Sequence, residues 1–141
     1  MPERDTYERR FDQNARIADI RSFVRKAIAA LGGGDDDGFA CELATDEAAS
    51  NAFEHAYAGG DGEVLVTVAR EGDEVVMSVR NWGAPFDPGQ VPAPDLDAPL
   101  EERKEGGLGL FLIRRFMNGV SFTFDPVEGN TITMRRRLIR K

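Results

Sequence analysis

The stretch ELATDEAASNAFEHAY, residues 42–57, has the pattern of a helix with unusual polar residues. Its apolar and small residues follow helical spacing, and Glu47, Asn51 and His55 recur at four-residue intervals. This spacing places a carboxylate, an amide and an imidazole on one stripe of a helix, each about one turn from the next. Asparagine is a poor helix former, and Asn51 has no capping role at mid-helix. The stripe predicts a functional surface or, as the simpler alternative, the solvated face of the helix.

Composition limits the class of protein. The 141 residues suffice for one domain, 1–141, and their net charge of −7 argues against nucleic-acid or anionic-membrane binding by the whole surface. Residues 103–141 carry nine basic and three acidic side chains, so this third suits phosphates or an acidic partner. Cys41, the single cysteine, is expected to be a buried thiol in a reducing compartment. Without a readable signal peptide or membrane span, the sequence predicts a cytoplasmic protein.

Hydrophobic periodicity predicts the order of the elements. The first elements are a strand at 6–13, a helix capped by Asn14 and ended by the glycines at 32–34, and an acidic loop at 35–38. The helix described above follows and ends near Ala58. The remaining elements are strands at 63–70 and 74–80, a helix at 108–118, and strands at 120–126 and 131–138. A long segment rich in Pro, Gly and charge is predicted to be an active-site lid at about 87–105. The order predicts an α+β two-layer sandwich, with helices on one face of a mixed β-sheet.

Two further motifs accompany the helical stripe. Asn81 directly follows the predicted strand 74–80, and Gly83 comes two residues later, so a side-chain amide lies beside a glycine that another group can approach closely. The run GGLG at 106–109 precedes a predicted helix, where unpaired N–H groups and the helix dipole favour a phosphate. Each motif alone also fits an ordinary turn or loop. Their combination in this order favours a binding site.

Together the three motifs resemble those of the Bergerat-fold ATPases, the group that contains DNA gyrase, a heat-shock chaperone ATPase and sensor histidine kinases. The shared pattern is a helix with Glu-x-x-x-Asn-x-x-x-His-Ala-Tyr, a strand ending in a polar-x-Gly turn, a lid, and a Gly-x-Gly start of a helix. Within this group the sequence is most similar to the small bacterial anti-sigma factor serine kinases. The resemblance covers nearly the whole chain and implies an ATP-binding domain of that fold.

The resemblance implies a role for each residue of the helical stripe. Asn51 would hold Mg²⁺ through its amide oxygen, with the ion bridging the phosphates of ATP, because Mg²⁺ prefers hard oxygen ligands and keeps several waters. Glu47 would be the catalytic base that orients or deprotonates the attacking hydroxyl. His55 would lie beside the phosphates.

The remaining motifs would complete the nucleotide site. Gly107 and Gly109 would let backbone N–H groups reach the phosphate chain. Arg103 or Lys104 would neutralise the charge of that chain when the lid closes. Thr131 matches the position that helps to hold adenine through water.

Asn81 departs from the family pattern, which usually has Asp accepting a hydrogen bond from the adenine amino group. An amide can present either its oxygen to that amino group or its NH₂ to a guanine carbonyl. A neutral hydrogen bond contributes about 1 kcal/mol less than a charged one. Asn81 is therefore expected to weaken ATP binding about fivefold and to relax the discrimination between purines.

The function implied is that of an anti-sigma factor with serine/threonine kinase activity. It would use ATP and Mg²⁺ to phosphorylate a small STAS-type anti-anti-sigma protein and so control a sigma factor by partner switching. A homodimer is expected by the same likeness, without direct nucleic-acid or membrane contact.

Two alternatives compete with the kinase. A non-catalytic nucleotide-binding or partner-binding module of the same fold is favoured by Asn81 and disfavoured by Glu47 with Asn51. The ATP-binding domain of a sensor histidine kinase would need a phosphoacceptor histidine on a preceding helix, whereas His55 is the only histidine of the sequence.

Overall fold

The computed structural model describes residues 5–84 and 107–138, without the side chains of 107–110. The elements in chain order are β1 (Thr6–Asp12), α1 (Ile17–Ala30), α2 (Asp35–Asn51), the π-helical turn η1 (Ala52–Ala56), β2 (Glu63–Glu71), β3 (Glu74–Asn81), α3 (Gly107–Phe116), β4 (Gly119–Asp125) and β5 (Gly129–Arg137). The two predicted hairpins, β2–β3 and β4–β5, are thereby confirmed. The predicted lid at 87–105 lies outside the described residues.

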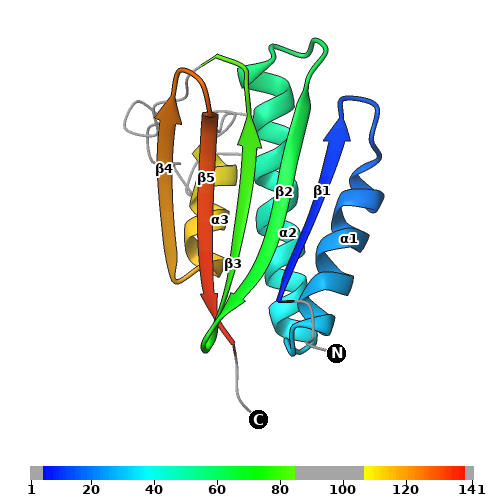
Figure 1. Cartoon of the computed structure of the whole chain (residues 1–141), viewed down its shortest axis with the longest axis vertical. Helices are drawn as coiled ribbons and strands as arrows, with labels where there is room; N and C mark the ends of the chain where they lie inside the picture. Colours follow the sequence, from blue (N-terminus) through cyan, green and yellow to red (C-terminus); the bar gives the residue numbers. More distant parts are fainter. Residues whose placement is uncertain (1–4, 85–106, 139–141) are drawn as a thin grey trace.

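The five strands form one sheet in the order β1-β2-β3-β5-β4, and the three α-helices lie together on one of its faces (Figure 1). The predicted α+β two-layer class is confirmed. The sheet is not mixed, however, because each of the four strand pairs is antiparallel. The connections explain this difference: two pairs are hairpins, and the two successive helices between β1 and β2 return the chain so that β2 runs opposite to β1.

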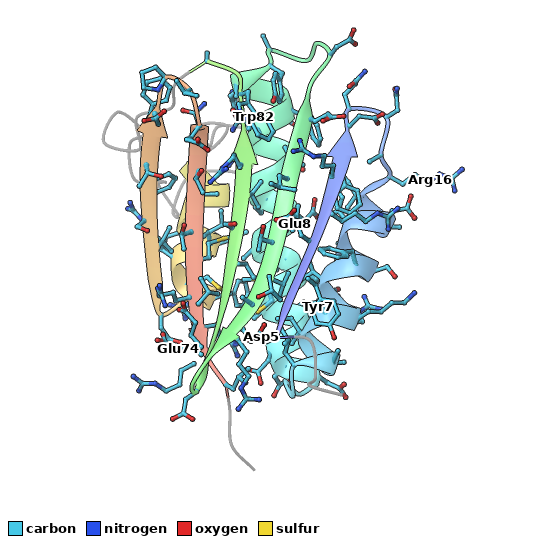
Figure 2. All side chains as sticks on the ribbon, viewed as in Figure 1. Asp5, Tyr7, Glu8, Arg16, Glu74 and Trp82 are labelled. Atoms are coloured by element: carbon cyan, nitrogen blue, oxygen red, sulfur yellow. The ribbon has the colours of Figure 1, made fainter. Side chains whose placement is uncertain are left out.

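The core lies between the sheet and the helices. Alternate residues of β2 and β3 face the helices and are fully or almost fully buried, namely Val64, Val66, Val68, Val75, Met77 and Val79. Small residues of α2, such as Ala44 and Ala48, let that helix lie close to the strands. Cys41 is also buried there, and burial raises the pKa of its thiol to about 12, so it remains protonated. On the opposite face, polar side chains such as Glu8 point to solvent (Figure 2).

The run DDDG begins α2, whereas the sequence predicted an acidic loop there. The main-chain N–H of Gly34 donates to the carboxylate of Asp37 at 3.2 Å, which satisfies one of the unpaired groups at the helix start. Three acidic residues in the first turn also interact favourably with the positive end of the helix dipole. The same charges that are typical of a loop therefore stabilise the beginning of this helix.

The predicted cap of the first helix is wrong. Helix α1 begins at Ile17, and no side chain forms a capping hydrogen bond at its N-cap residue, Arg16. The main-chain N–H of Asn14 instead donates to the carboxylate of Asp12 at 2.9 Å. Asn14 therefore belongs to a turn that follows β1, in which Asp accepts hydrogen bonds from the residues after it.

A buried carboxylate joins α1 to α2. Glu42 is 2% exposed, and it accepts a hydrogen bond from Arg21 at 2.8 Å and two from Arg25 at 2.6 and 2.9 Å. The hydrogen bond from Arg25 is the main reason why the pKa of Glu42 lies below its ordinary value of 4.5. The folded chain therefore stabilises the ionised form of Glu42, and this stabilisation depends on pH.

Exchange of Glu42 for glutamine should lower the free energy of unfolding by about 1 kcal/mol at pH 7, because the negative charge that faces Arg21 and Arg25 is lost and the amide NH₂ accepts no hydrogen bond. A group with a lowered pKa contributes stability above its unfolded pKa and loses it as pH falls through the folded pKa. The difference between wild type and Glu42→Gln should therefore shrink below about pH 4.5. Urea unfolding between pH 3 and pH 7 measures it. Glu63→Gln, in an exposed pair with Arg10, is the control and should behave as wild type. If the difference in free energy of unfolding between wild type and Glu42→Gln were constant with pH, the ionised form of Glu42 would not be the one that stabilises the fold.

Candidate nucleotide site

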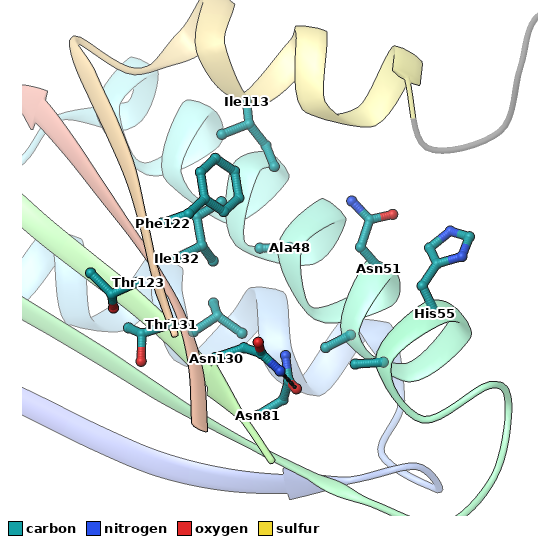
Figure 3. Close-up of a pocket in the computed structure, with 13 residues that line it drawn as sticks. Ala48, Asn51, His55, Asn81, Ile113, Phe122, Thr123, Asn130, Thr131 and Ile132 are labelled. Carbon is teal, nitrogen blue, oxygen red and sulfur yellow. Dashed lines mark hydrogen bonds between the residues drawn. The ribbon is translucent and has the colours of Figure 1, made fainter. Parts of the chain in front are cut away.

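A pocket opens between the helical layer and the ends of the central strands (Figure 3). It holds about 600 Å³ of empty space, and this volume includes the part that is open to solvent. Its polar lining comes from α2, η1 and three strands: Asn51, His55, Asn81, Thr123, Asn130 and Thr131. Its apolar lining consists of Ala48, Ala52, Ala56, Val79, Ile113, Phe122 and Ile132. A mostly apolar pocket with a few polar groups is suited to a planar base.

The helix that carries the polar stripe widens between Asn51 and His55. In η1 the N–H of Tyr57 donates to the carbonyl of Ala52 at 3.0 Å, five residues earlier, as in a π-helix. Such turns contain an extra residue and frequently occur at functional sites. The four-residue spacing did not indicate this change of geometry. Asn51 and His55 nevertheless line the same pocket, and Figure 3 shows both pointing toward the side where α3 begins.

Glu47 lies one turn before Asn51 and is not among the residues that line the pocket. Its side chain is half-buried. Burial raises the pKa of Glu47 above its ordinary value of 4.5, and the negative charges of Asp46 and Glu54 raise it further. A carboxylate with a raised pKa is a stronger proton acceptor, so the environment of Glu47 is compatible with general-base chemistry.

The turn after β3 packs against η1. A Cβ atom added to Gly83 would lie 2.3 Å from the carbonyl oxygen of Ala56, and the N–H of Ala84 donates to that oxygen at 2.8 Å. The hydroxyl of Tyr57 accepts a hydrogen bond from the N–H of Trp82 at 2.9 Å. The close approach expected at Gly83 is thus made by the backbone of the protein itself. This contact fixes the end of β3 against the helix.

Asn81 is buried at the floor of the pocket, directly opposite Asn130 in the β3–β5 register. Its Oδ1 accepts hydrogen bonds from the N–H of Gly83 and from Nδ2 of Asn130, both at 3.0 Å. Nδ2 of Asn130 also lies within hydrogen-bond distance of the carbonyls of Gly83 and Ala84, at 3.2 and 3.1 Å. Oδ1 of Asn130 is buried and has no hydrogen-bond partner among the described residues.

Sequence reasoning missed Asn130 and selected its neighbour Thr131. Side chains alternate along a strand, and Thr131 pairs with Arg80 whereas Asn130 pairs with Asn81. The hydroxyl of Thr131 accepts a hydrogen bond from Nε of Arg80 at 3.2 Å. Thr131 contributes to the pocket lining, but the side chain that contacts Asn81 is that of Asn130. The only sequence feature that could have indicated Asn130 is its position directly after Gly129, and an asparagine beside a glycine also fits an ordinary turn.

The other predicted ligand contacts are described only in part. Gly107 and Gly109 lie in the first turn of α3, the helix whose Ile113 lines the pocket. Arg103 and Lys104 lie outside the described residues. For Mg²⁺, Asn51 offers an amide oxygen on a half-buried side chain that makes no hydrogen bond to another described residue. Such an oxygen fits the ligand chemistry of this ion.

The fold is an antiparallel sheet covered on one face by helices, with a pocket between α2, β3 and α3, and the sequence comparison assigns it to a family. Residues 12–136 match the family described as histidine kinase-like ATPase domain, and the chain belongs to this family. The resemblance to the Bergerat-fold group is thereby confirmed.

Relatives within the family are bacterial protein kinases. The chain is 30% identical over 129 residues to the serine-protein kinase RsbW of Bacillus cereus (strain Q1), covering 89% of this chain and 79% of that protein. Over the same shares it is 30% identical to serine-protein kinase RsbW of Bacillus thuringiensis subsp. konkukian (strain 97-27) and 29% identical to that of Bacillus mycoides (strain KBAB4). In residues 5–84 and 107–138, no helix is long and apolar enough to cross a membrane.

Proposed function

We propose that this protein is an anti-sigma factor with serine/threonine kinase activity. It binds ATP with Mg²⁺ and phosphorylates a small STAS-type anti-anti-sigma protein, which controls a sigma factor by partner switching. The proposal rests above all on the convergence of Asn51, His55 and Asn81, from separate elements, on one pocket next to α3. Its likeness to serine-protein kinases named RsbW supports the type of reaction.

Each part of the pocket has a task in this proposal. The apolar walls and the amides of Asn81 and Asn130 hold the base. Asn51 holds the metal ion, and His55 lies at the phosphate side of the same helix. The first turn of α3, with Gly107 and Gly109, presents backbone N–H groups and the positive end of its dipole to the phosphates. Arg103 and Lys104 are proposed to add positive charge there.

Glu47 is the general base of the proposed transfer. It accepts the proton of a partner hydroxyl while the oxygen of that hydroxyl bonds to the γ-phosphorus, and the bond to the bridging oxygen of ADP breaks. ATP supplies the phosphoryl group, and Mg²⁺ supplies positive charge that offsets the charge of the phosphates. The raised pKa of Glu47 supports this assignment, because a stronger proton acceptor removes the hydroxyl proton more readily.

A second candidate is a non-catalytic module of the same fold that holds a partner with or without nucleotide. The observation in its favour is Asn81, a neutral amide where kinases of the group usually have a carboxylate. Under either reading the partners are a sigma factor and its antagonist, and a homodimer and a cytoplasmic location belong to the proposal.

Two measurements test the proposed function. Calorimetry with Mg-ATP and Mg-ADP at millimolar concentration should give saturable heat. Labelled ATP mixed with candidate antagonists from the same genome should transfer its γ-phosphate to a serine or threonine. Absence of heat and of thermal stabilisation with both nucleotides would exclude the nucleotide site. Binding without transfer to any antagonist would favour the non-catalytic module.

Exchange of Asn51 for alanine should remove the dependence of ATP binding on Mg²⁺. In the wild type, affinity should be at least about tenfold higher with Mg²⁺ than with a chelator, whereas the ratio for Asn51→Ala should be close to one. Paired titrations measure the ratio. Asn14→Ala is the control, because Asn14 is exposed and does not line the pocket. A variant that keeps the wild-type ratio would show that another group holds the metal ion.

A further inference from the structure

The two amides at the pocket floor have fixed orientations. Oδ1 of Asn81 accepts from the N–H of Gly83 and from Nδ2 of Asn130, so turning the Asn81 amide over would set its NH₂ against two donors. Nδ2 of Asn130 faces three oxygens, those of Asn81, Gly83 and Ala84, so turning this amide over would set oxygen against oxygen. The hydrogen-bond pattern therefore defines which atom of each amide remains for a ligand.

One donor and one acceptor remain. Nδ2 of Asn81 makes no hydrogen bond to another described residue, and Oδ1 of Asn130 is buried without a partner there. Figure 3 shows these two atoms on the pocket side of the pair. Asn130 is 7% exposed, and a buried acceptor without a donor is unfavourable by about 1–3 kcal/mol. A ligand that brings an N–H group to Oδ1 would remove this penalty.

We infer that Asn81 and Asn130 form a mixed donor–acceptor pair that binds the edge of a purine and admits 6-oxopurine nucleotides about as well as 6-aminopurine nucleotides. This inference rests on the proposed function, because it concerns the base of the nucleotide that the pocket binds. The sequence suggests that the oxygen of Asn81 accepts a hydrogen bond from the adenine amino group, but this oxygen already accepts two hydrogen bonds within the protein.

The chemistry of the two bases explains the lack of discrimination. Adenine presents an acceptor at N1 beside a donor at N6, and hypoxanthine presents a donor at N1 beside an acceptor at O6. Each edge thus offers one donor and one acceptor to the N–H of Asn81 and the carbonyl of Asn130, in reversed order, so that Asn81 donates to N1 of adenine but to O6 of a displaced hypoxanthine. A carboxylate at position 81 would leave two acceptors at the pocket floor, which suit the two N–H groups of the adenine amino group, whereas hypoxanthine has one N–H beside O6, which the carboxylate repels.

The test compares Mg-ATP, Mg-ITP and the Mg-triphosphate of purine riboside by calorimetry. Wild type should bind ATP and ITP within about threefold of each other. Purine riboside triphosphate has no substituent at position 6 and brings no N–H group to Oδ1 of Asn130, so it should bind about tenfold more weakly than ATP. Asn81→Asp should bind ATP about threefold to tenfold more tightly than wild type and prefer it to ITP by at least about tenfold.

Asn118→Asp is the matched control. It makes the same change of charge outside the pocket, and Oδ1 of Asn118 accepts from the N–H of Arg137, a bond that a carboxylate retains. It should keep the wild-type ratio of ATP to ITP. A wild-type preference for ATP over ITP above about tenfold, or equal binding of ATP and purine riboside triphosphate, would overturn the inference but leave the proposed function. Failure to bind any of the three nucleotides would overturn both.

Discussion

Changing Glu47 to glutamine is expected to lower phosphate transfer by at least about a hundredfold while the affinity for ATP stays within about threefold of wild type. Glutamine keeps the shape of the side chain but accepts no proton near neutral pH. Glu47 does not line the pocket, so the change should leave ATP binding in place. The measurement combines single-turnover transfer from labelled ATP to the antagonist with calorimetry. Equal phosphorylation by wild type and variant would remove Glu47 from the mechanism.

The pH dependence of transfer provides a second test of Glu47. The active form of a base is the carboxylate, so transfer should fall as pH drops through the raised pKa of Glu47. Glu54 is exposed, and its negative charge contributes to that raised pKa. The control variant Glu54→Gln should therefore keep transfer within about threefold at neutral pH and move the acidic limb of the profile to lower pH. If the acidic limb of the pH profile stays in place in Glu54→Gln, the titrating group is not Glu47.

The sequence predicted the fold well where local pattern determines structure. Alternation of apolar residues in 63–70 and 74–80 predicted the central hairpin, because one face of each strand is buried against helices. It failed where the same residues suit two structures. Three aspartates are typical of a loop, yet they also stabilise the first turn of α2 through the helix dipole and the hydrogen bond from Gly34 to Asp37.

The sequence predicted a residue of the candidate site only where that residue belongs to a recognisable local motif. Asn51 and His55 share one helix, and Asn81 precedes a glycine turn, so their roles were predicted from spacing and resemblance. Asn130 was not, because its contact with Asn81 depends on the β3–β5 register between residues 49 positions apart. Strand order and register are long-range properties, and a single sequence gives no direct measure of them.

Replacement of Gly83 by alanine should disturb both folding and the pocket. The added methyl group would lie 2.3 Å from the carbonyl oxygen of Ala56 and 2.6 Å from its carbon, which is backbone that cannot turn aside as a side chain can. Overpacking of this kind destabilises by about 1–3 kcal/mol. The turn also supplies the N–H that orients Asn81 and a carbonyl that accepts from Asn130. We therefore expect a loss of about 2–3 kcal/mol in the free energy of unfolding and at least about tenfold in ATP affinity.

Gly38→Ala is the matched control for Gly83→Ala, and it should have the opposite sign. Gly38 lies within α2, and its new Cβ would lie 3.8 Å from Cγ of Arg25, an ordinary contact. Alanine is the better helix former by up to about 1 kcal/mol, so this variant should be as stable as wild type or more stable. Urea unfolding and ATP titration of both variants measure the effects. If Gly83→Ala unfolds at the wild-type urea concentration and binds ATP normally, the turn after β3 can move away from η1, and the contact between Gly83 and Ala56 does not hold the base-binding amides in place.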